Sequence, residues 1–137
     1  MIPGLSGERV ESIAIAIDTS GSIDEEMLIT SAREVLGLLP HAEEVVIIVA
    51  DAKVQDVTDA DGFEPMVRQN SLRGGGGTDH RPVFEYLTDQ GITPTIFIGF
   101  TDLCSAFPEV QPTFPVLWIA PKTHGAAPWG DVIVLPE

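Results

Sequence analysis

The sequence of 137 residues predicts one α/β domain built as a three-layer sandwich. Its central sheet is expected to be mostly parallel with one antiparallel edge strand, and helices should cover both faces. Two observations carry this prediction. Several strand-length runs are apolar on both alternating faces, which is typical of central strands covered on both sides. Stretches with helical periodicity alternate with these runs, as in right-handed parallel crossovers.

The first strand and helix open a Rossmann-like pattern. Ser12–Asp18 alternates isoleucine and alanine, so that both faces of the strand are apolar. Ser22 and Glu25 have the spacing of a capping box, in which hydroxyl and carboxylate satisfy free amides of the first helical turn. Apolar residues then follow at helical spacing until Pro40, which ends the predicted helix.

The remainder of the chain continues this alternation. Glu44–Ala50 is predicted as a second buried strand, Lys53–Thr58 as an antiparallel edge strand and Asp59–Ser71 as a loop. Thr78 or Asp79 is expected to cap a helix that stops at Gly91. Three further strands are predicted, at Thr95–Phe100, Val116–Ile119 and Val132–Leu135. The segment between the first two of these strands can hold at most a short helix.

Composition excludes several functional classes. The formal net charge of −14 repels phosphate backbones, so nucleic acid is not an expected partner. The longest apolar runs have strand length, so no membrane span or membrane association is expected. No signal peptide is visible, and the single cysteine, Cys104, excludes an internal disulfide framework. A cytoplasmic protein is expected, with residues 1–8 as a lead-in and residues 9–137 as the single domain.

Three polar motifs are predicted to meet at one edge of the sheet. Asp18, Ser20 and Ser22 follow the first strand, Thr78 stands at a predicted helix start, and Asp102 follows the strand that ends at Phe100. Ligands of open α/β sheets bind beyond the carboxyl ends of the parallel strands. All five side chains offer oxygen, which suits a hard cation: Mg²⁺ fits best, with Mn²⁺ or Ca²⁺ as alternatives.

These residues, in this order on this strand pattern, resemble the von Willebrand factor A (VWA) domain and its metal-ion-dependent adhesion site. The resemblance implies Mg²⁺ or Mn²⁺, with Ser20 and Ser22 as direct ligands through their hydroxyls. It implies that Asp18 and Asp102 bind directly or through water, and that Thr78 joins or leaves the shell with the conformational state. A carboxylate from a partner protein would fill the vacant coordination position.

A closer likeness is to a compact bacterial subgroup of VWA-like domains. Pro3-Gly4-Leu5 and the glycine run that leads through Thr78 to Pro82 resemble that subgroup. There the domain follows a metallopeptidase-like domain in one polypeptide, and some members occur beside AAA+ ATPases. This chain contains no His-Glu-x-x-His motif, so peptidase activity is not implied. Leu103 also stands where the family often has glycine after the Thr-Asp step.

Three functions follow from this pattern. The leading hypothesis is a non-enzymatic, metal-dependent protein-binding module that accepts an acidic side chain from a partner. The alternatives are a metal-dependent hydrolase or phosphoryl-transfer enzyme with Asp18 at its centre, and a metal-free scaffold that packs on a neighbouring domain. His80 is interpreted as a surface or helix-start residue, and Cys104 as a small core residue.

Overall fold

The computed structural model describes residues 10–21, 23–69, 72, 75–122 and 124–135. The strands are β1 Val10–Asp18, β2 Ala42–Ala50, β3 Val54–Thr58, β4 Ile96–Phe100, β5 Val116–Ala120 and β6 Asp131–Val134. The α-helices are α1 Glu25–Leu38, α2 Ala60–Arg68 and α3 Arg81–Asp89, and a 3₁₀ turn, Leu39–His41, follows α1.

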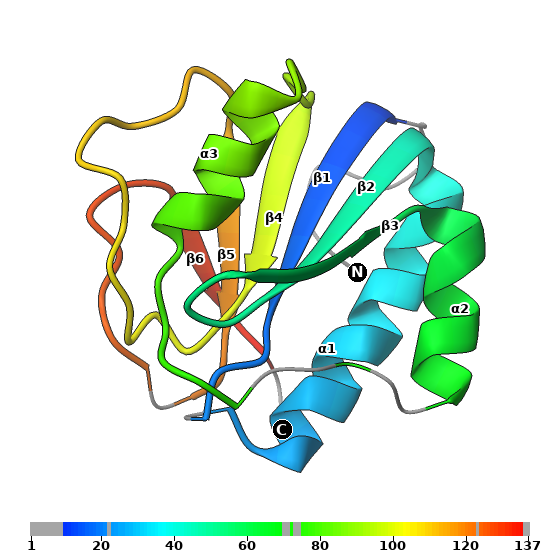
Figure 1. The fold of residues 1–137 in the computed structure, drawn as a ribbon, viewed down its shortest axis with the longest axis horizontal. Coiled ribbons are helices and arrows are strands. Elements are labelled where there is room, and N and C mark those ends of the chain that lie inside the picture. Colours follow the sequence, from blue (N-terminus) through cyan, green and yellow to red (C-terminus); the bar gives the residue numbers. More distant parts are fainter. Residues whose placement is uncertain (1–9, 22, 70–71, 73–74, 123, 136–137) are drawn as a thin grey trace.

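The strands form one six-stranded sheet in the order β3-β2-β1-β4-β5-β6 (Figure 1). β3 pairs with β2 in the antiparallel direction, and every other neighbouring pair is parallel. The predicted mostly parallel sheet with an antiparallel edge strand is therefore confirmed. β1 lies between β2 and β4, so the strand that carries the Asp18 motif is central, as its two apolar faces indicate.

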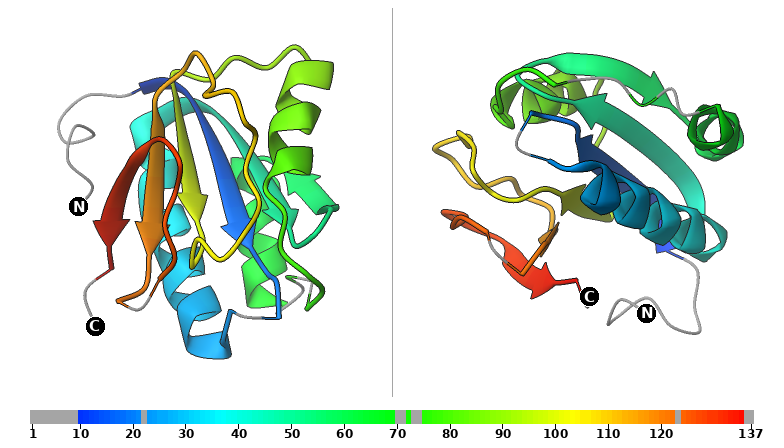
Figure 2. Two further views of the ribbon diagram at one scale, coloured as in Figure 1. Left: turned by 90° about the vertical axis from the view of Figure 1, so that its left-hand side faces the viewer. Right: turned by 90° about the horizontal axis from the view of Figure 1, so that it is seen from below.

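Helices cover both faces of the sheet, which confirms the three layers (Figures 1 and 2). On one face α1 packs against β1, whose isoleucines lie in the same core cluster, and α2 packs against β2 and β3, with Val35 and Phe63 fully buried. On the other face α3 places Val83, Phe84 and Leu87 against the alanines of β1 and the aromatic residues of β4 and β5. The Ile/Ala alternation of the first strand thus assigns its larger side chains to the α1 and α2 layer.

Trp118 of β5 is the centre of the aromatic packing beside α3. It is fully buried, and a Cβ atom on the neighbouring Gly99 would lie 2.5 Å from its ring. Glycine at that position of β4 therefore makes room for the indole. The indole Nε1 donates a hydrogen bond to the Trp129 carbonyl oxygen at 3.0 Å, so Trp129 belongs to a packed loop.

The prediction of a loop over Asp59–Ser71 was wrong, because α2 occupies most of it. Asp59 caps this helix by accepting a hydrogen bond from the Gly62 amide at 2.9 Å. Gly62 and Pro65 disfavour a helix locally, and the segment is short and polar. The helix is stabilised by a tertiary contact, the burial of Phe63 on the sheet. A single sequence does not reveal that contact.

The start of α1 also differs from the prediction. Asp24 is the N-cap residue, and its Oδ1 atom accepts a hydrogen bond from the Met27 amide at 2.7 Å. Ser22, which was expected to cap this helix and to bind metal, lies outside the described residues. Because Asp24 already supplies the cap, the helix start does not depend on the Ser22 hydroxyl.

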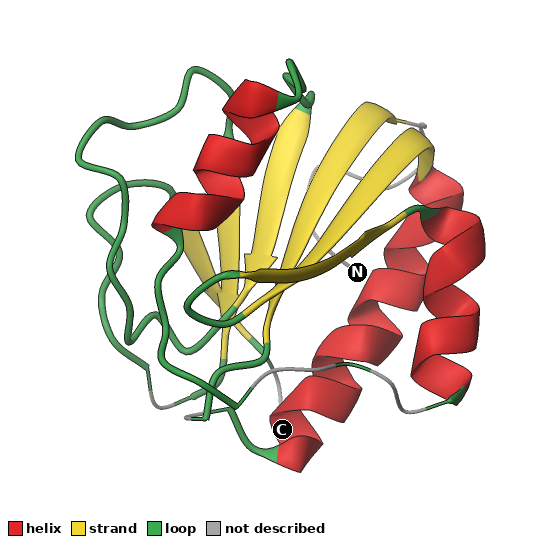
Figure 3. Ribbon diagram, in the orientation of Figure 1, coloured by secondary structure: helices red, strands yellow, loops and turns green. Residues whose placement is uncertain are grey.

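Long loops join the last strands (Figure 3). The segment between β4 and β5 holds bends and an isolated bridge, Asp79 to Ala106, and no helix in its described residues. The described helices include none that is both long and apolar enough to cross a membrane.

Candidate functional site

The carboxyl ends of β1, β2 and β4 meet at one edge of the sheet. Asp18 is the last residue of β1 and is in register with Ala50 at the end of β2. Ile17 is in register with Phe100 at the end of β4, so Thr101 and Asp102 follow directly beside Asp18. The parallel sheet therefore places both residues that were predicted to supply carboxylates, Asp18 and Asp102, at one edge, as the strand pattern indicates.

Asp18 is held in one orientation by hydrogen bonds to both carboxylate oxygens. Oδ1 accepts from the Ser20 amide at 2.8 Å, and Oδ2 accepts from the Thr101 hydroxyl at 2.6 Å. The side chain is buried, with 4% of its surface exposed. A carboxylate with two donors in a buried site is fixed more firmly than one in solvent, because any rotation would leave a buried polar atom unpaired.

The loop that follows β1 packs against the glycine run. The Gly75 amide donates to the Thr19 carbonyl at 2.6 Å, and the Gly21 amide donates to the Gly76 carbonyl at 2.9 Å. A Cβ atom on Gly21 would lie 3.0 Å from the Gly75 oxygen, so glycine permits this close approach. Ser20, buried within the loop, is thus placed by backbone contacts with a segment more than fifty residues away in the chain.

Asp51, which the sequence interpretation missed, anchors the segment that carries Thr78. Its carboxylate accepts hydrogen bonds from Gln55 Nε2 at 2.9 Å, the Gly76 amide at 3.1 Å and the Lys53 amide at 3.2 Å. Burial alone would raise the pKa of this carboxyl, but the hydrogen bonds together outweigh burial and hold the pKa below the usual 3.8.

The Asp51 backbone holds the same segment at a second point. Its carbonyl oxygen accepts from the Asp79 amide at 3.3 Å. Half-buried Thr78 therefore lies between two residues, Gly76 and Asp79, that are both bonded to Asp51. The signal that could have found Asp51 is its place directly after a buried parallel strand.

Asp102 lies just beyond β4 and is also buried. Its Oδ1 atom accepts from the Cys104 amide at 3.1 Å, and its carbonyl oxygen accepts from the Gly125 amide at 2.8 Å. Leu103 has a φ of 65°, the left-handed conformation that glycine adopts most easily. The loop thus keeps a glycine-like backbone although this chain has leucine there. Cys104 is exposed, so its interpretation as a core residue was wrong.

His80 lies inside the protein beside the site, so its interpretation as a surface residue was wrong. Only 5% of it is exposed, and its ring stacks on Trp118 with 5.3 Å between the ring centroids. Its Nε2 atom lies 3.0 Å from Thr101 Oγ1. The sequence contains a signal for this burial, because Val83 and Leu87 follow His80 by three and seven residues, the spacing of one apolar face of a helix.

Burial lowers the pKa of His80 below its usual 6.5, although the charges of Asp18, Asp79 and Asp102 oppose that shift. The imidazole is therefore neutral at pH 7. His80 also occupies the N-cap position of α3 without a side-chain capping bond, so the prediction of Thr78 or Asp79 at that position was wrong.

Asp79, the residue before the N-cap His80, instead stabilises the start of α3. Its Oδ1 atom accepts from the Arg81 amide at 2.9 Å, and its Oδ2 atom lies 2.8 Å from Arg81 Nη2. The guanidinium group holds the pKa of Asp79 below its ordinary value. This carboxylate is therefore paired and is not a candidate ligand.

The donor set at the edge fits a hard divalent cation. The described predicted ligands, Asp18, Ser20, Thr78 and Asp102, offer only carboxylate and hydroxyl oxygen. Among the described residues, no group of three or more His, Cys, Asp or Glu side chains could hold a metal ion. A cation at this edge would therefore be held by two carboxylates together with hydroxyls and water, which is a typical Mg²⁺ environment.

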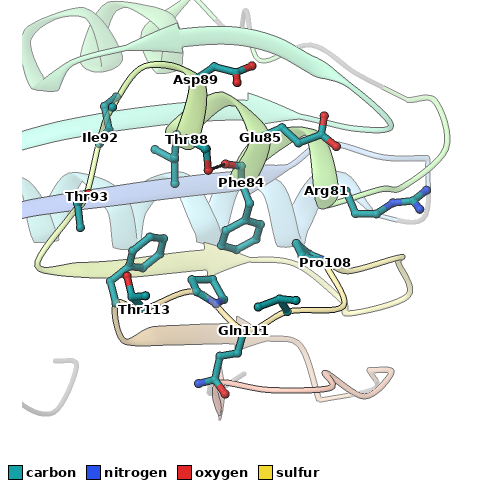
Figure 4. Close-up of a pocket in the computed structure, with 15 residues that line it drawn as sticks. Arg81, Phe84, Glu85, Thr88, Asp89, Ile92, Thr93, Pro108, Gln111 and Thr113 are labelled. Atoms are coloured by element: carbon teal, nitrogen blue, oxygen red, sulfur yellow. Dashed lines mark hydrogen bonds between the residues drawn. The ribbon is translucent and has the colours of Figure 1, made fainter.

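A larger groove lies between α3 and the loop that follows β4 (Figure 4). Its volume is about 780 Å³, and its described lining contains none of the predicted ligands. Phe84, Pro108 and Phe114 supply apolar walls, and Glu85 and Asp89 extend from α3 at its margin.

The strand order and the polar loops at the carboxyl edge together define a VWA-like domain. The family described as "VWA-like domain (DUF2201)" matches residues 13–136, and the chain belongs to this family. The predicted resemblance to VWA domains is thereby confirmed. No curated protein matches the sequence. The metal ligands and the neighbouring metallopeptidase-like domain stay predictions.

Proposed function

We propose that this domain is a protein-interaction module that binds a divalent cation, and that the bound cation accepts an Asp or Glu side chain from a partner protein. Mg²⁺ is the expected ion, with Mn²⁺ or Ca²⁺ as alternatives. The residues that would hold it are Asp18, Ser20, Ser22, Thr78 and Asp102. The cation would supply the positive charge that lets an acidic domain recruit an acidic side chain.

The fixed Asp18 carboxylate is the observation that carries this proposal. It lies at the carboxyl edge of the central strand, and each of its oxygens already has one hydrogen-bond donor. Each carboxylate oxygen can accept a further interaction. A buried anion without a cationic partner is unfavourable, and neutral His80 does not supply a positive charge. A divalent cation at this edge would compensate the charge.

The surrounding loops support the same proposal. Ser20 and Thr78 lie on two segments that are joined by backbone hydrogen bonds. The positions of both residues are therefore set by the folded backbone. Where Asp18 and Asp102 bind through water, neutral hydroxyls are the direct ligands and leave much of the charge of the cation uncompensated. Such an ion attracts one more anionic oxygen, which a partner carboxylate can provide.

Two features of the expected partner follow from the family resemblance and the charge. A metallopeptidase-like domain or an AAA+ ATPase is the expected source of the acidic side chain, and the complex is expected in the cytoplasm. The net charge of −14 would oppose such a complex without the cation. Chelation is therefore expected to release the partner.

Thermal melting tests the proposal directly. The chain is melted in EDTA and then with Mg²⁺, Mn²⁺ or Ca²⁺, alongside Asp18→Ala and the control Asp89→Ala, which removes an exposed carboxylate at the end of α3. At about 100 times its Kd a ligand stabilises the folded state by about 2.7 kcal/mol, a shift of several degrees in Tm. We expect that shift in the wild type and the control, and none in Asp18→Ala.

The two alternatives give different results. A wild type that folds but responds to none of the ions contradicts the proposal and favours the metal-free scaffold. Turnover of phosphoesters or peptides with Mg²⁺ would favour the hydrolase or phosphoryl-transfer enzyme. We expect no turnover, because the predicted ligand set contains no lysine or arginine that would balance a phosphate.

A further inference from the structure

The Thr101 hydroxyl is the centre of a buried polar chain behind the proposed cation site. Its oxygen lies 2.6 Å from Asp18 Oδ2, 3.0 Å from His80 Nε2 and 3.1 Å from the Leu103 amide nitrogen. Thr101 and His80 are both buried, with 1% and 5% of their surfaces exposed. The hydroxyl therefore depends on protein groups for its hydrogen bonds.

The number of protons available fixes the direction of each bond. A hydroxyl has one proton to donate and can accept two hydrogen bonds. The Leu103 amide can only donate, and the Asp18 carboxylate can only accept, so the hydroxyl proton lies toward Asp18 Oδ2. The distance of 2.6 Å is typical of a hydroxyl that donates to an ionised carboxylate. His80 must then donate its Nε2 proton to Thr101.

We propose that His80 is a positioning residue for the cation site: its Nε2 proton holds the Thr101 hydroxyl in the orientation that fixes Asp18. This inference rests on the proposed metal-binding function. If the ring carried its proton on Nδ1 instead, Nε2 would become an acceptor and compete with Asp18 for the only hydroxyl proton. The choice of tautomer therefore decides whether Asp18 Oδ2 keeps its donor.

The surroundings of His80 hold the ring in place for this role. Trp118 stacks on it at 5.3 Å and Phe107 packs against it at 5.2 Å, both measured between ring centroids. A ring fixed on two sides presents Nε2 to Thr101 in one direction. Groups that orient a metal ligand in this way typically contribute 10- to 100-fold to metal affinity.

Substitutions separate this role from simple packing. His80→Phe keeps an aromatic ring in contact with Trp118 and Phe107 but removes the donor. Thr101→Val removes the hydroxyl with little change in shape. His80→Gln restores an amide donor at the end of a side chain of similar reach. Alanine at residue 80 is unsuitable, because it would enlarge a cavity of about 10 Å³ that borders these residues and let water replace the donor.

Mg²⁺ affinity, measured by calorimetric titration with Tm shifts in parallel, is the main readout. We expect His80→Phe and Thr101→Val each to weaken Mg²⁺ binding by about 10- to 100-fold. The double variant should be no weaker than the single ones, because the two residues act in one chain. His80→Gln is expected to recover part of the affinity. Phe114→Leu, the packing control, changes a ring of the same aromatic cluster that packs on Phe84 and Phe97, and it should lower Tm but leave the Mg²⁺ affinity unchanged.

The tautomer is measured independently of the metal. In the metal-free wild type, ¹⁵N-edited NMR of the His80 ring is expected to show a neutral imidazole with its proton on Nε2. A proton on Nδ1 overturns the inference even if the variants fail to fold. Wild-type Mg²⁺ binding that His80→Phe leaves intact overturns the role of His80 alone. A folded wild type that binds no ion overturns both this role and the proposed function.

Discussion

The carboxyl edge of the sheet and the groove beside α3 adjoin the same helix but are built in different ways. At the edge, buried carboxylates and hydroxyls are fixed by hydrogen bonds of 2.6–3.2 Å, several of them from backbone amides. The groove has apolar walls from α3 and the following loop, with a volume of about 780 Å³. One region is small and polar, and the other is large and mostly apolar.

This difference predicts which positions of the molecule tolerate substitution. A buried polar group without its partner costs about 1–3 kcal/mol, so each contact at the edge constrains its neighbours. A side chain on the wall of an open groove can change with little effect on folding. Stability and metal response should therefore depend on the edge and be insensitive to the groove.

Asp51→Asn is expected to destabilise the fold by about 1.5–3 kcal/mol, the usual range for hydrogen bonds to a charged group. The new amide would direct a donor toward the donors of Gln55 or Gly76, which the carboxylate now accepts. Urea denaturation at pH 7 measures the loss. Asp56→Asn, on the exposed edge strand, serves as the control and should have little effect.

The pH dependence of this loss follows from the lowered pKa of Asp51. Because the folded protein binds this proton less readily than the unfolded chain, the stabilisation is complete above about pH 3.8 and is lost as the pH falls through the folded-state pKa. The difference between wild type and Asp51→Asn should therefore narrow below pH 3.8. A difference that stays constant between pH 6 and pH 3 would contradict the assignment.

Leu103→Gly compares backbone strain with side-chain burial at one position. Glycine would relieve a left-handed backbone that costs leucine about 1–2 kcal/mol. It would also remove a side chain that is only 2% exposed, and truncation of a buried leucine costs about 2–5 kcal/mol. We expect a net loss of about 1–3 kcal/mol by thermal denaturation. A gain in Tm would show that strain outweighs burial here.

Val110→Ser should have the smallest effect. This valine is 82% exposed on the wall of the groove, so its replacement should change the free energy of unfolding by less than about 0.5 kcal/mol. The Mg²⁺-induced shift in Tm should also be unchanged, measured beside Asp18→Ala. A weakened metal response in Val110→Ser would break the proposed separation between groove and edge.

The layers, and the sheet edge that carries the candidate site, follow from the sequence alone. The alternating isoleucine and alanine of β1 forced a central strand covered on both sides, because exposure of either face would leave apolar surface in water. Parallel neighbours then brought Asp18 and Asp102 to one edge without any further information. Both results follow from local periodicity, which a single sequence displays.

The sequence signals the positions of Asp51 and His80, but the tertiary structure decided which groups they contact and whether α2 forms. The local sequence of α2 disfavours a helix, and the packing of Phe63 on the sheet, together with the Asp59 cap, stabilises it. Asp51 acts through amides distant in the chain, and His80 is enclosed by Trp118 and Phe107, which come from other segments. Hydrogen bonds and packing between distant residues depend on the folded arrangement, so no local pattern encodes them.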